Sequence, residues 1–213
     1  NLGNLKCQPG YYVIIPRGII WQIVPDETLK LLVIESTGPI ETPNRYRNRF
    51  GQLLEHSPFC ERDIKVPILQ DPKDESGEFL IRVKTHIGIQ EYSYAHHPFD
   101  IIGWDGYYFP WSLNIGDFEP IVGSIHQPPP VHQTFQAMGF VVCSFVPRLF
   151  DFHPDSIPAP YPHSNVDSDE IIFYSKGDFM SRQGIQAESI THHPMGLPHG
   201  PQPGKYEESI GKK

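Results

Sequence analysis

The most informative stretch of the sequence lies near its C-terminal end, where residues 163–170 read HSNVDSDE and residues 194–199 read PMGLPH. Successive residues of a strand alternate between its two faces, so His163 and Glu170, seven apart, would point in opposite directions on one continuous strand. A turn or bulge after His163 would realign them. A hairpin would then return His199 on a neighbouring strand, and two imidazoles and one carboxylate would converge.

This set of three side chains has a defined chemistry. Two neutral nitrogens and one anionic oxygen on one face of an octahedron leave three positions free, which suits a ferrous ion that binds a chelating substrate and dioxygen together. A histidine and a glutamate at this spacing also occur as an ordinary surface pair. The spacing alone therefore leaves a metal site and a surface pair as alternatives.

The composition favours a turn-rich β protein. The 213 residues include 23 prolines and 18 glycines, which is incompatible with long helices throughout, and 38% hydrophobic residues suffice for a packed core. The formal net charge of −8 argues against a protein that coats nucleic acid or an anionic membrane. The sequence contains no run of 18 apolar residues, so no segment is expected to span a bilayer.

The cysteines indicate a reduced setting. Cys7, Cys60 and Cys143 are far apart and form no CxxC pair, so neither a disulfide framework nor a cysteine-built zinc site is expected. A cytoplasmic location fits this pattern best.

Local patterns predict short elements along the whole chain. Apolar runs between turn residues predict antiparallel strands and hairpins, and two stretches favour helix. The expected strands are residues 11–15, 20–24, 29–35, 140–146 and 170–174, residues 79–92 form a hairpin, and residues 44–54 and 206–210 are helical.

The order of the C-terminal motifs resembles a known superfamily. His-x-Asn-x4-Glu-x6-Gly from His163 to Gly177, followed by Pro-x-Gly-x2-His from Pro194 to His199, is similar to the paired motifs of the cupins. Asn165 stands where many cupins have a second histidine. The resemblance implies a mainly β fold, the cupin double-stranded β-helix or jelly-roll barrel.

A second resemblance concerns the first forty residues. Gly10, Pro16, Arg17 and Gly18 are spaced like the opening of the second cupin motif, but Trp21 stands where the metal-binding histidine would be. A tight turn between two strands explains these residues fully. The expected architecture is bicupin-like with an incomplete N-terminal barrel: residues 1–38 are the back half of a metal-free barrel, residues 39–123 a connecting segment with a short helix and a hairpin, and residues 124–213 the C-terminal metal-binding barrel with the start of a C-terminal helix.

A narrower resemblance covers nearly the whole chain from about Gly10 onward. The segments 104–106, 117–120, 125–135, 158–170 and 199–204 are similar to homogentisate 1,2-dioxygenases, particularly their shorter bacterial branch. Members of that family are longer at both ends, so the chain is expected to be a fragment. The family implies homo-oligomers, trimers or hexamers.

The resemblance also implies a reaction and its residues. Fe(II) would be held by His163, Glu170 and His199, and homogentisate and O2 would be converted to maleylacetoacetate, with both oxygen atoms entering the product, in tyrosine and phenylalanine catabolism. His126 would take the proton of the substrate hydroxyl, and His193 would hydrogen-bond the substrate or oxygen. His193, His199 and Phe179 would contact the substrate.

Several assignments stay open. Phe179 stands where better-studied members of the family carry a tyrosine that contacts substrate. This difference weakens the assignment of homogentisate as the exact substrate more than the assignment of ring cleavage as the reaction. Alternatives are a dioxygenase for another hydroxylated aromatic acid such as a gentisate-like compound, a non-catalytic cupin, and a zinc or manganese cupin isomerase.

Other polar and aromatic residues rank lower as site candidates. His132 is ambiguous, His192 would point away from His193 on a strand, and Asp169 could orient ligands or simply be solvated. The side chains expected to serve packing or a subunit contact are His96, His97, Trp104 and Trp111.

Overall fold

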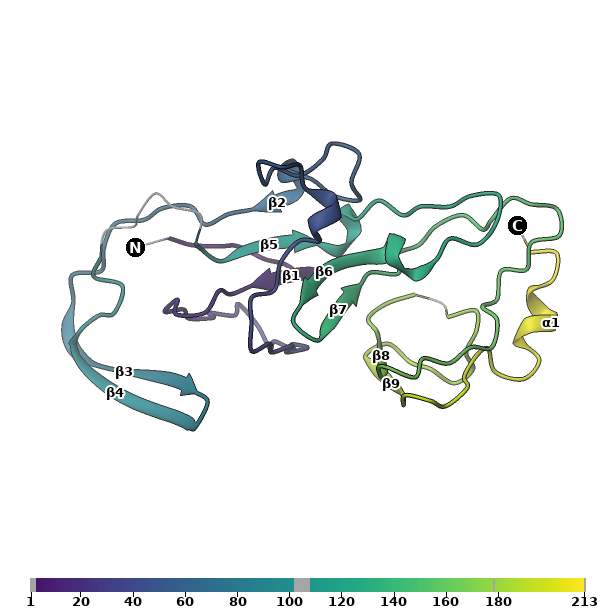
Figure 1. Cartoon of the computed structure of the whole chain (residues 1–213). Coiled ribbons are helices and arrows are strands. Elements are labelled where there is room, and N and C mark those ends of the chain that lie inside the picture. The colour runs from purple at the N-terminus through teal and green to yellow at the C-terminus, as the bar shows by residue number, and fades with distance from the viewer. Residues whose placement is uncertain (1–2, 102–107, 178, 213) are drawn as a thin grey trace. The chain divides into compact units, whose positions relative to one another are not determined.

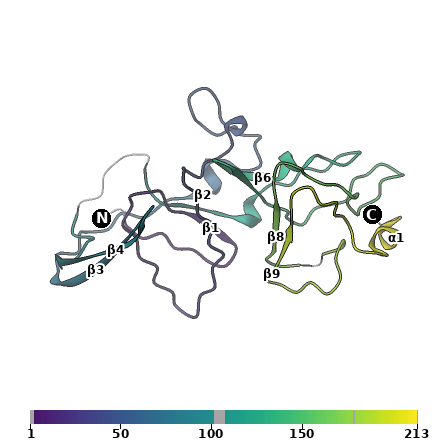
Figure 2. The same ribbon diagram turned by 60° about the horizontal axis from the view of Figure 1, so that its bottom comes forward.

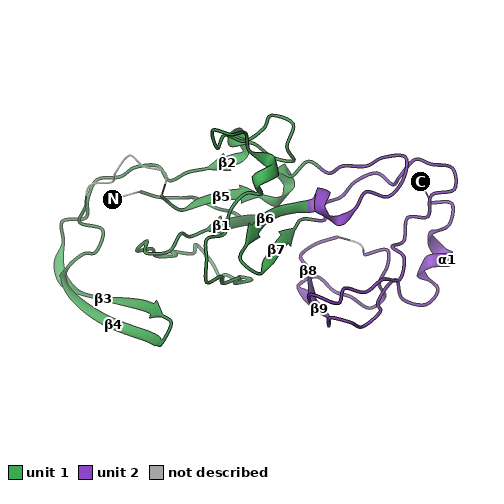
Figure 3. Cartoon of the chain, viewed as in Figure 1, with its two compact units in different colours: residues 1–119, 133–144 green, residues 120–132, 145–213 purple. Residues whose placement is uncertain are grey.

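The computed structural model describes residues 3–101, 108–177 and 179–212. The described chain is mainly β, with nine strands, four short 3-10 helices and one α-helix. Contacts group it into two compact units (Figure 3): unit 1 is Asn1–Glu119 with Gln133–Ser144, and unit 2 is Pro120–His132 with Phe145–Lys213. Residues 133–144 thus lie with unit 1, whereas they are expected from the sequence to belong to the C-terminal region. The assignment of the regions to two cupin barrels stays a prediction.

Unit 1 contains a three-stranded antiparallel sheet (Figure 1). β5 (Trp111–Asn114) is central, with β1 (Tyr11–Ile14) on one side and β2 (Ile64–Lys65) on the other. β1 coincides with the strand expected at residues 11–15, less its last residue. Leu113 and Ser112 of the central strand are fully buried, so this strand lies against the core of unit 1.

The core of unit 1 is aromatic. Phe59, Phe118 and Phe135 are at most 2% exposed, and the ring of Phe135 meets Tyr12 and Trp111 edge-on at centroid distances of 5.1 and 5.7 Å. Such edge-to-face pairs are stabilising beyond the apolar area that they bury. Trp111 therefore serves packing, as expected, while Trp104 lies outside the described residues.

A hairpin of unit 1 carries Phe135, which packs into this core. β6 (Gln133–Ala137) and β7 (Phe140–Cys143) are joined through Gly139, whose φ of +86° is open to glycine without steric cost. The β6 backbone is tied to the 3-10 helix η1 (Asn44–Tyr46) by the Tyr46 hydroxyl, which donates to the Gln133 carbonyl at 2.6 Å. Of the helix expected over residues 44–54, only this one turn forms.

The predicted hairpin around residues 79–92 is confirmed and is longer than expected. β3 (Ser76–Thr85) and β4 (Gly88–His96) pair antiparallel through a two-residue turn, and Figures 1 and 2 show them as a two-stranded ribbon. Arg82 and Glu91 form a cross-strand ion pair at 2.8 Å. The ring of His97 packs between Phe79 and Phe99, which supports the packing role expected for it.

Two predicted strands are wrong. Residues 20–24 and 29–35 form no strand, and their apolar side chains, such as Trp21 and Val33, are exposed. A strand needs a pairing partner for its backbone, and no strand in the described residues pairs with this segment. The remaining short helices of unit 1 are η2 (Glu61–Asp63) and η3 (Ile115–Asp117).

Unit 2 is built from few regular elements. They are η4 (Pro129–His132), β8 (Glu170–Tyr174), β9 (Ser189–His193) and α1 (Lys205–Ser209). β8 has the predicted bounds, and α1 begins one residue before the helix expected at 206–210. In both ribbon views β8 and β9 lie side by side as a hairpin (Figures 1 and 2).

The strands of the described residues do not form a closed barrel. They make one three-stranded sheet and three two-stranded sheets. The mainly β class is confirmed, whereas none of the sheets in the described residues closes on itself as the predicted jelly-roll barrel requires. Among the helices described, none has the length and apolar character needed to cross a membrane.

Candidate metal centre

The main chain fixes the separation of the two predicted histidine ligands in unit 2. His163 and His199 face each other in an antiparallel bridge, and each backbone N–H donates to the carbonyl of the other at 2.8 Å. Their rings lie 4.4 Å apart between centroids. Two residues that are 36 apart in the sequence are thus brought together by a reciprocal pair of peptide hydrogen bonds.

Both imidazoles are oriented in the same way. Nδ1 of His163 lies 3.0 Å from the carbonyl oxygen of Tyr161, and Nδ1 of His199 lies 3.0 Å from that of Leu197. A carbonyl only accepts, so each Nδ1 carries the proton and donates to the carbonyl two residues earlier. Nε2 of each ring is then the unprotonated nitrogen with a lone pair, the form in which histidine binds a metal.

Glu170 is placed by the register of the β8–β9 hairpin. It is the first residue of β8, directly opposite His193, the last residue of β9. Alternation puts both side chains on one face of the hairpin, and Oε1 of Glu170 lies 2.7 Å from Nδ1 of His193. The same Oε1 lies 3.7 Å from Nε2 of His199, so the carboxylate reaches the histidine pair.

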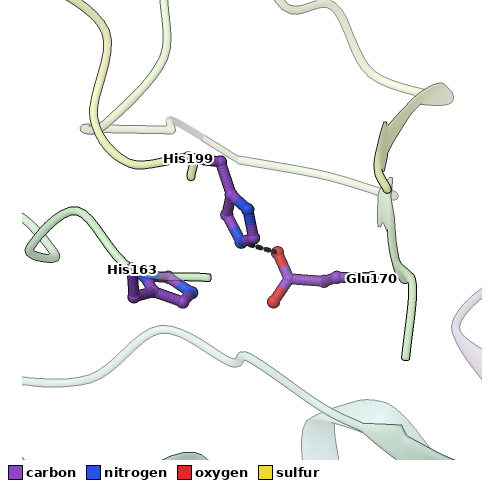
Figure 4. A group of neighbouring side chains, drawn as sticks. All are labelled: His163, Glu170 and His199. Carbon is purple, nitrogen blue, oxygen red and sulfur yellow. Dashed lines mark ion pairs between the residues drawn. The ribbon is translucent and has the colours of Figure 1, made fainter. Parts of the chain in front are cut away.

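The three predicted ligands converge (Figure 4). His163, Glu170 and His199 each offer one donor atom, and these atoms lie within 4.8 Å of one another. Nε2 of His199 is buried without a hydrogen-bond partner, which is costly for a polar atom unless another ligand satisfies it. Two imidazole nitrogens and one carboxylate therefore fit a divalent transition metal such as Fe(II), whose preferred donors they are.

The loop between His163 and Glu170 supplies the turn that an unbroken strand could not. The side-chain oxygen of Asn165 accepts from the backbone of Asp167 at 2.9 Å, a local turn that redirects the chain. Its side-chain amide donates to Ser168 at 2.8 Å, and its carbonyl accepts from Gly196 at 2.7 Å. Asn165 thus organises the loop between two of the candidate ligands.

Asp169 and His192 lie outside the ligand group. His192 pairs with Ile171 in the register and contacts Asp169 at 3.2 Å, on the hairpin face opposite to Glu170 and His193. The backbone N–H of Met195 also donates to Asp169 at 2.8 Å. The hydrogen bond from Met195 contributes most, and the one from His192 next, to holding the pKa of Asp169 below its usual value. The expected opposite direction of His192 is borne out by the register.

The predicted proton acceptor His126 lies one aromatic ring away from a ligand. The ring of Tyr161 stands edge-on to both His126 and His163, at centroid distances of 6.0 and 5.9 Å. His126 is exposed. The structure therefore places His126 beside the ligand loop without direct contact to Glu170 or His199 among the interactions described.

His132, unlike His126, is almost completely buried. It is 2% exposed, and its ring packs against Phe145 at 4.7 Å. Burial, with smaller contributions from the charges of Arg148 and His126, lowers the pKa of His132 to about 4. His132 is consequently a neutral, packed histidine near neutral pH.

Phe179 lies beside a cavity in the connection between β8 and β9. Its ring stands edge-on to Tyr174 at 4.5 Å. The cavity, of about 290 Å³, is lined by Gly177, Phe179, Met180, Arg182, Gly184, Ile185 and Lys205. Of these lining residues, only Phe179 is a substrate contact expected from the sequence.

Sequence reasoning missed Arg182. Its guanidinium reaches His193, Tyr174 and the carbonyl of Gly200, the residue after His199. An arginine in a Gly-rich, polar connection gives no motif or periodic signal, so only the folded arrangement reveals it. Tyr161 was also not named, although it stands two residues before His163.

Comparison with known proteins agrees with the sequence patterns. A family model described as homogentisate 1,2-dioxygenase N-terminal matches residues 1–115. A protein of Saccharolobus solfataricus that carries the provisional name of a dioxygenase is 47% identical over 211 residues, which are 99% of this chain and 54% of the relative.

Two relatives named homogentisate 1,2-dioxygenase are more distant. The protein of Bradyrhizobium diazoefficiens is 25% identical over 98% of this chain and 48% of its own length, and that of Emericella nidulans is 23% identical over 97% and 48%. The chain spans about half the length of these curated relatives. The metal-centre residues lie outside the 115 matched residues but inside the alignments that cover nearly all of the chain.

The family match is decisive for classification, because it covers 115 of 213 residues. The relatives that align over nearly the entire chain point in the same direction. The chain belongs to the homogentisate 1,2-dioxygenase N-terminal family.

Proposed function

We propose that the chain carries the metal centre of an Fe(II)-dependent, ring-cleaving dioxygenase that converts homogentisate and O2 to maleylacetoacetate. The observation that carries this proposal is the convergence of His163, Glu170 and His199, with both histidines oriented so that Nε2 is the unprotonated nitrogen. The dioxygenase names of the relatives support the reaction class. The atoms of the reaction balance, because both oxygen atoms of O2 enter the product as the aromatic ring opens.

The residues of the centre have separable tasks. A ferrous ion held there would supply adjacent positions for a chelating substrate and dioxygen. His163 and His199 would bind it through Nε2, and Glu170 would contribute the negative charge. The Glu170 side chain is 44% exposed, so a small aromatic acid can approach the carboxylate from solvent.

His126 is proposed as the acceptor of the substrate hydroxyl proton. It is exposed, and the ring of Tyr161 lies between it and His163 of the ligand loop. A neutral imidazole has one ring nitrogen with a free lone pair, which is the acceptor that a general base needs.

The second candidate substrate is a gentisate-like acid. Phe179 packs edge-on against Tyr174 and offers no hydroxyl, so a hydrogen bond that a tyrosine there would give to substrate is lost. A substrate whose carboxylate is attached directly to the ring differs from homogentisate by one methylene. Such a difference typically changes selectivity by about 10-fold to 200-fold.

Oxygen uptake tests the proposal. The protein is stripped of metal, loaded anaerobically with ferrous iron or with zinc, and mixed with homogentisate or gentisate under reducing conditions. Uptake with homogentisate in the iron-loaded protein alone, with both atoms of labelled O2 in the product, is the expected result. Uptake only with gentisate favours the second candidate. Absence of uptake with both acids contradicts the dioxygenase proposal, and turnover without oxygen in the zinc-loaded protein favours an isomerase.

A further inference from the structure

Arg182 lies in the connection between β8 and β9 and contacts three separate parts of unit 2. Its Nε donates to the hydroxyl of Tyr174 at the end of β8, at 3.2 Å, and its Nη1 donates to the carbonyl of Gly200. Its Nη2 lies 3.2 Å from Nε2 of His193 at the end of β9. One half-buried guanidinium therefore spans both strands of the hairpin and the segment that follows His199.

The contact with His193 fixes which ring nitrogen carries the proton. A guanidinium has only donors, so Nε2 of His193 must be the acceptor. A neutral imidazole that accepts at Nε2 carries its proton on Nδ1. Nδ1 lies 2.7 Å from Oε1 of Glu170, so His193 donates to the proposed metal-binding carboxylate.

Arg182 also supports the histidine ligands through the backbone. Gly200 follows His199 directly, and His199 is bridged to His163 by two peptide hydrogen bonds. Holding the Gly200 carbonyl restricts the chain on the far side of this bridge. The rings of His193 and His199 are also stacked, 4.4 Å apart with 21° between their planes.

We propose that Arg182 is a positioning residue of the metal centre. It holds His193 in the tautomer that donates to Glu170, and it anchors the chain after His199. The inference rests on the metal centre proposed above. It gives His193 a different task from the substrate contact expected from sequence, because both ring nitrogens of His193 face protein partners.

The fork of an arginine suits this position better than a single ammonium group. Arginine presents its N–H donors in a rigid plane, and here three of its nitrogens serve three acceptors that diverge from one another. Tyr174 is 6% exposed and packs against Phe179, so the hydroxyl that receives Nε is itself held in place. Lysine could satisfy only part of this set at one time.

The first test needs neither metal nor substrate. Nitrogen NMR of metal-free protein with labelled histidines, in which the His193 signal is assigned by its loss in His193→Gln, reports the tautomer directly. The expected result is a proton on Nδ1 in the wild type and a changed or mixed tautomer in Arg182→Met. A wild-type His193 with its proton on Nε2 would overturn the proposal, and this outcome does not depend on whether any variant folds.

The second test measures the binding of Co(II) by its visible spectrum, which reports the ligand set of the ion. Arg182→Met is expected to bind about 10-fold to 100-fold more weakly, the usual cost of removing a group that orients a ligand. Lys176→Met is the matched control, because it removes an exposed positive charge from the same connection and should bind like the wild type. Arg182→Lys should stay weakened, since it keeps the charge and loses the fork.

The outcomes separate this inference from the proposed function. Wild-type affinity in folded Arg182→Met or in Arg182→Lys contradicts the positioning role and leaves the metal centre intact. A wild-type protein that binds no metal contradicts the proposed function itself, whatever the tautomer of His193.

Discussion

Unit 1 and unit 2 bury different kinds of side chain. Unit 1 encloses a cluster of aromatic rings around Phe59, Phe118 and Phe135, each at most 2% exposed. The buried side chains described in unit 2 are Tyr174, Val146, Ala159, His132 and Ser209, and its ligand residues are held by hydrogen bonds. The difference teaches that one unit is specified mainly by packing and the other mainly by directional polar contacts. Substitutions should therefore affect stability in unit 1 and metal binding in unit 2.

The largest effect is expected from Glu170→Ala. It removes the single anionic donor of the predicted ligand set, so the protein should lose its bound iron when metal content is measured by elemental analysis after gel filtration. The free energy of unfolding of the metal-free protein should fall by only about 1–2 kcal/mol, because the side chain is 44% exposed and loses one hydrogen bond. Glu207→Ala, an exposed carboxylate of α1, is the control and should retain iron. Unchanged iron stoichiometry in Glu170→Ala would refute the ligand set.

Phe135→Ala should have the opposite signature. The ring is 1% exposed and contacts Tyr12, Phe59 and Trp111, so its removal should cost about 3–5 kcal/mol in the free energy of unfolding. Denaturant titration followed by tryptophan fluorescence measures the loss, and the folded fraction should bind metal with wild-type stoichiometry. Phe50→Ala, at a residue that is 74% exposed, should change stability by no more than about 0.5 kcal/mol. Equal losses in the two variants would remove the contrast between the units.

The smallest effect concerns pH and the buried histidine of unit 2. The pKa of His132 is lowered to about 4 in the folded chain and is about 6.5 when unfolded, so the unfolded chain binds more protons between these values. Stability should therefore fall on acidification from pH 6.5 to pH 4, by up to about 3 kcal/mol. His132→Gln should flatten this slope in urea titrations at several pH values. His153→Gln, at an exposed histidine of the same unit, should keep the slope, and an unchanged slope in His132→Gln would contradict the assignment.

The grouping of the three candidate ligands could be predicted from sequence because each lies in a local motif, and their binding of a metal stays a prediction. The turn after His163, strand β8 starting at Glu170 and the return of His199 all follow from residue types within short windows, and the structure brings these three residues together. Arg182 could not be predicted, because its role depends on three acceptors brought together only by folding.

The fold was less predictable than the site. The hairpin of β3 and β4 is a contact between neighbours in sequence, and its pattern was visible. Residues 20–24 and 29–35 have the same apolar, β-branched character but form no strand, because strand formation needs a partner that composition does not reveal. Barrel closure likewise depends on pairing across long stretches of chain, which local periodicity cannot specify.

The backbone bridge between His163 and His199 has a consequence for how this site tolerates change. Because each residue is held by the peptide group of the other, insertions or deletions in the loops on either side can be absorbed without altering the spacing of the pair. The bridge is made by main-chain groups alone, so exchanging either side chain should leave it intact. Replacing one imidazole by a thiolate or a carboxylate would thus present a new donor on an unchanged frame, which makes the pair a suitable place to redesign metal preference.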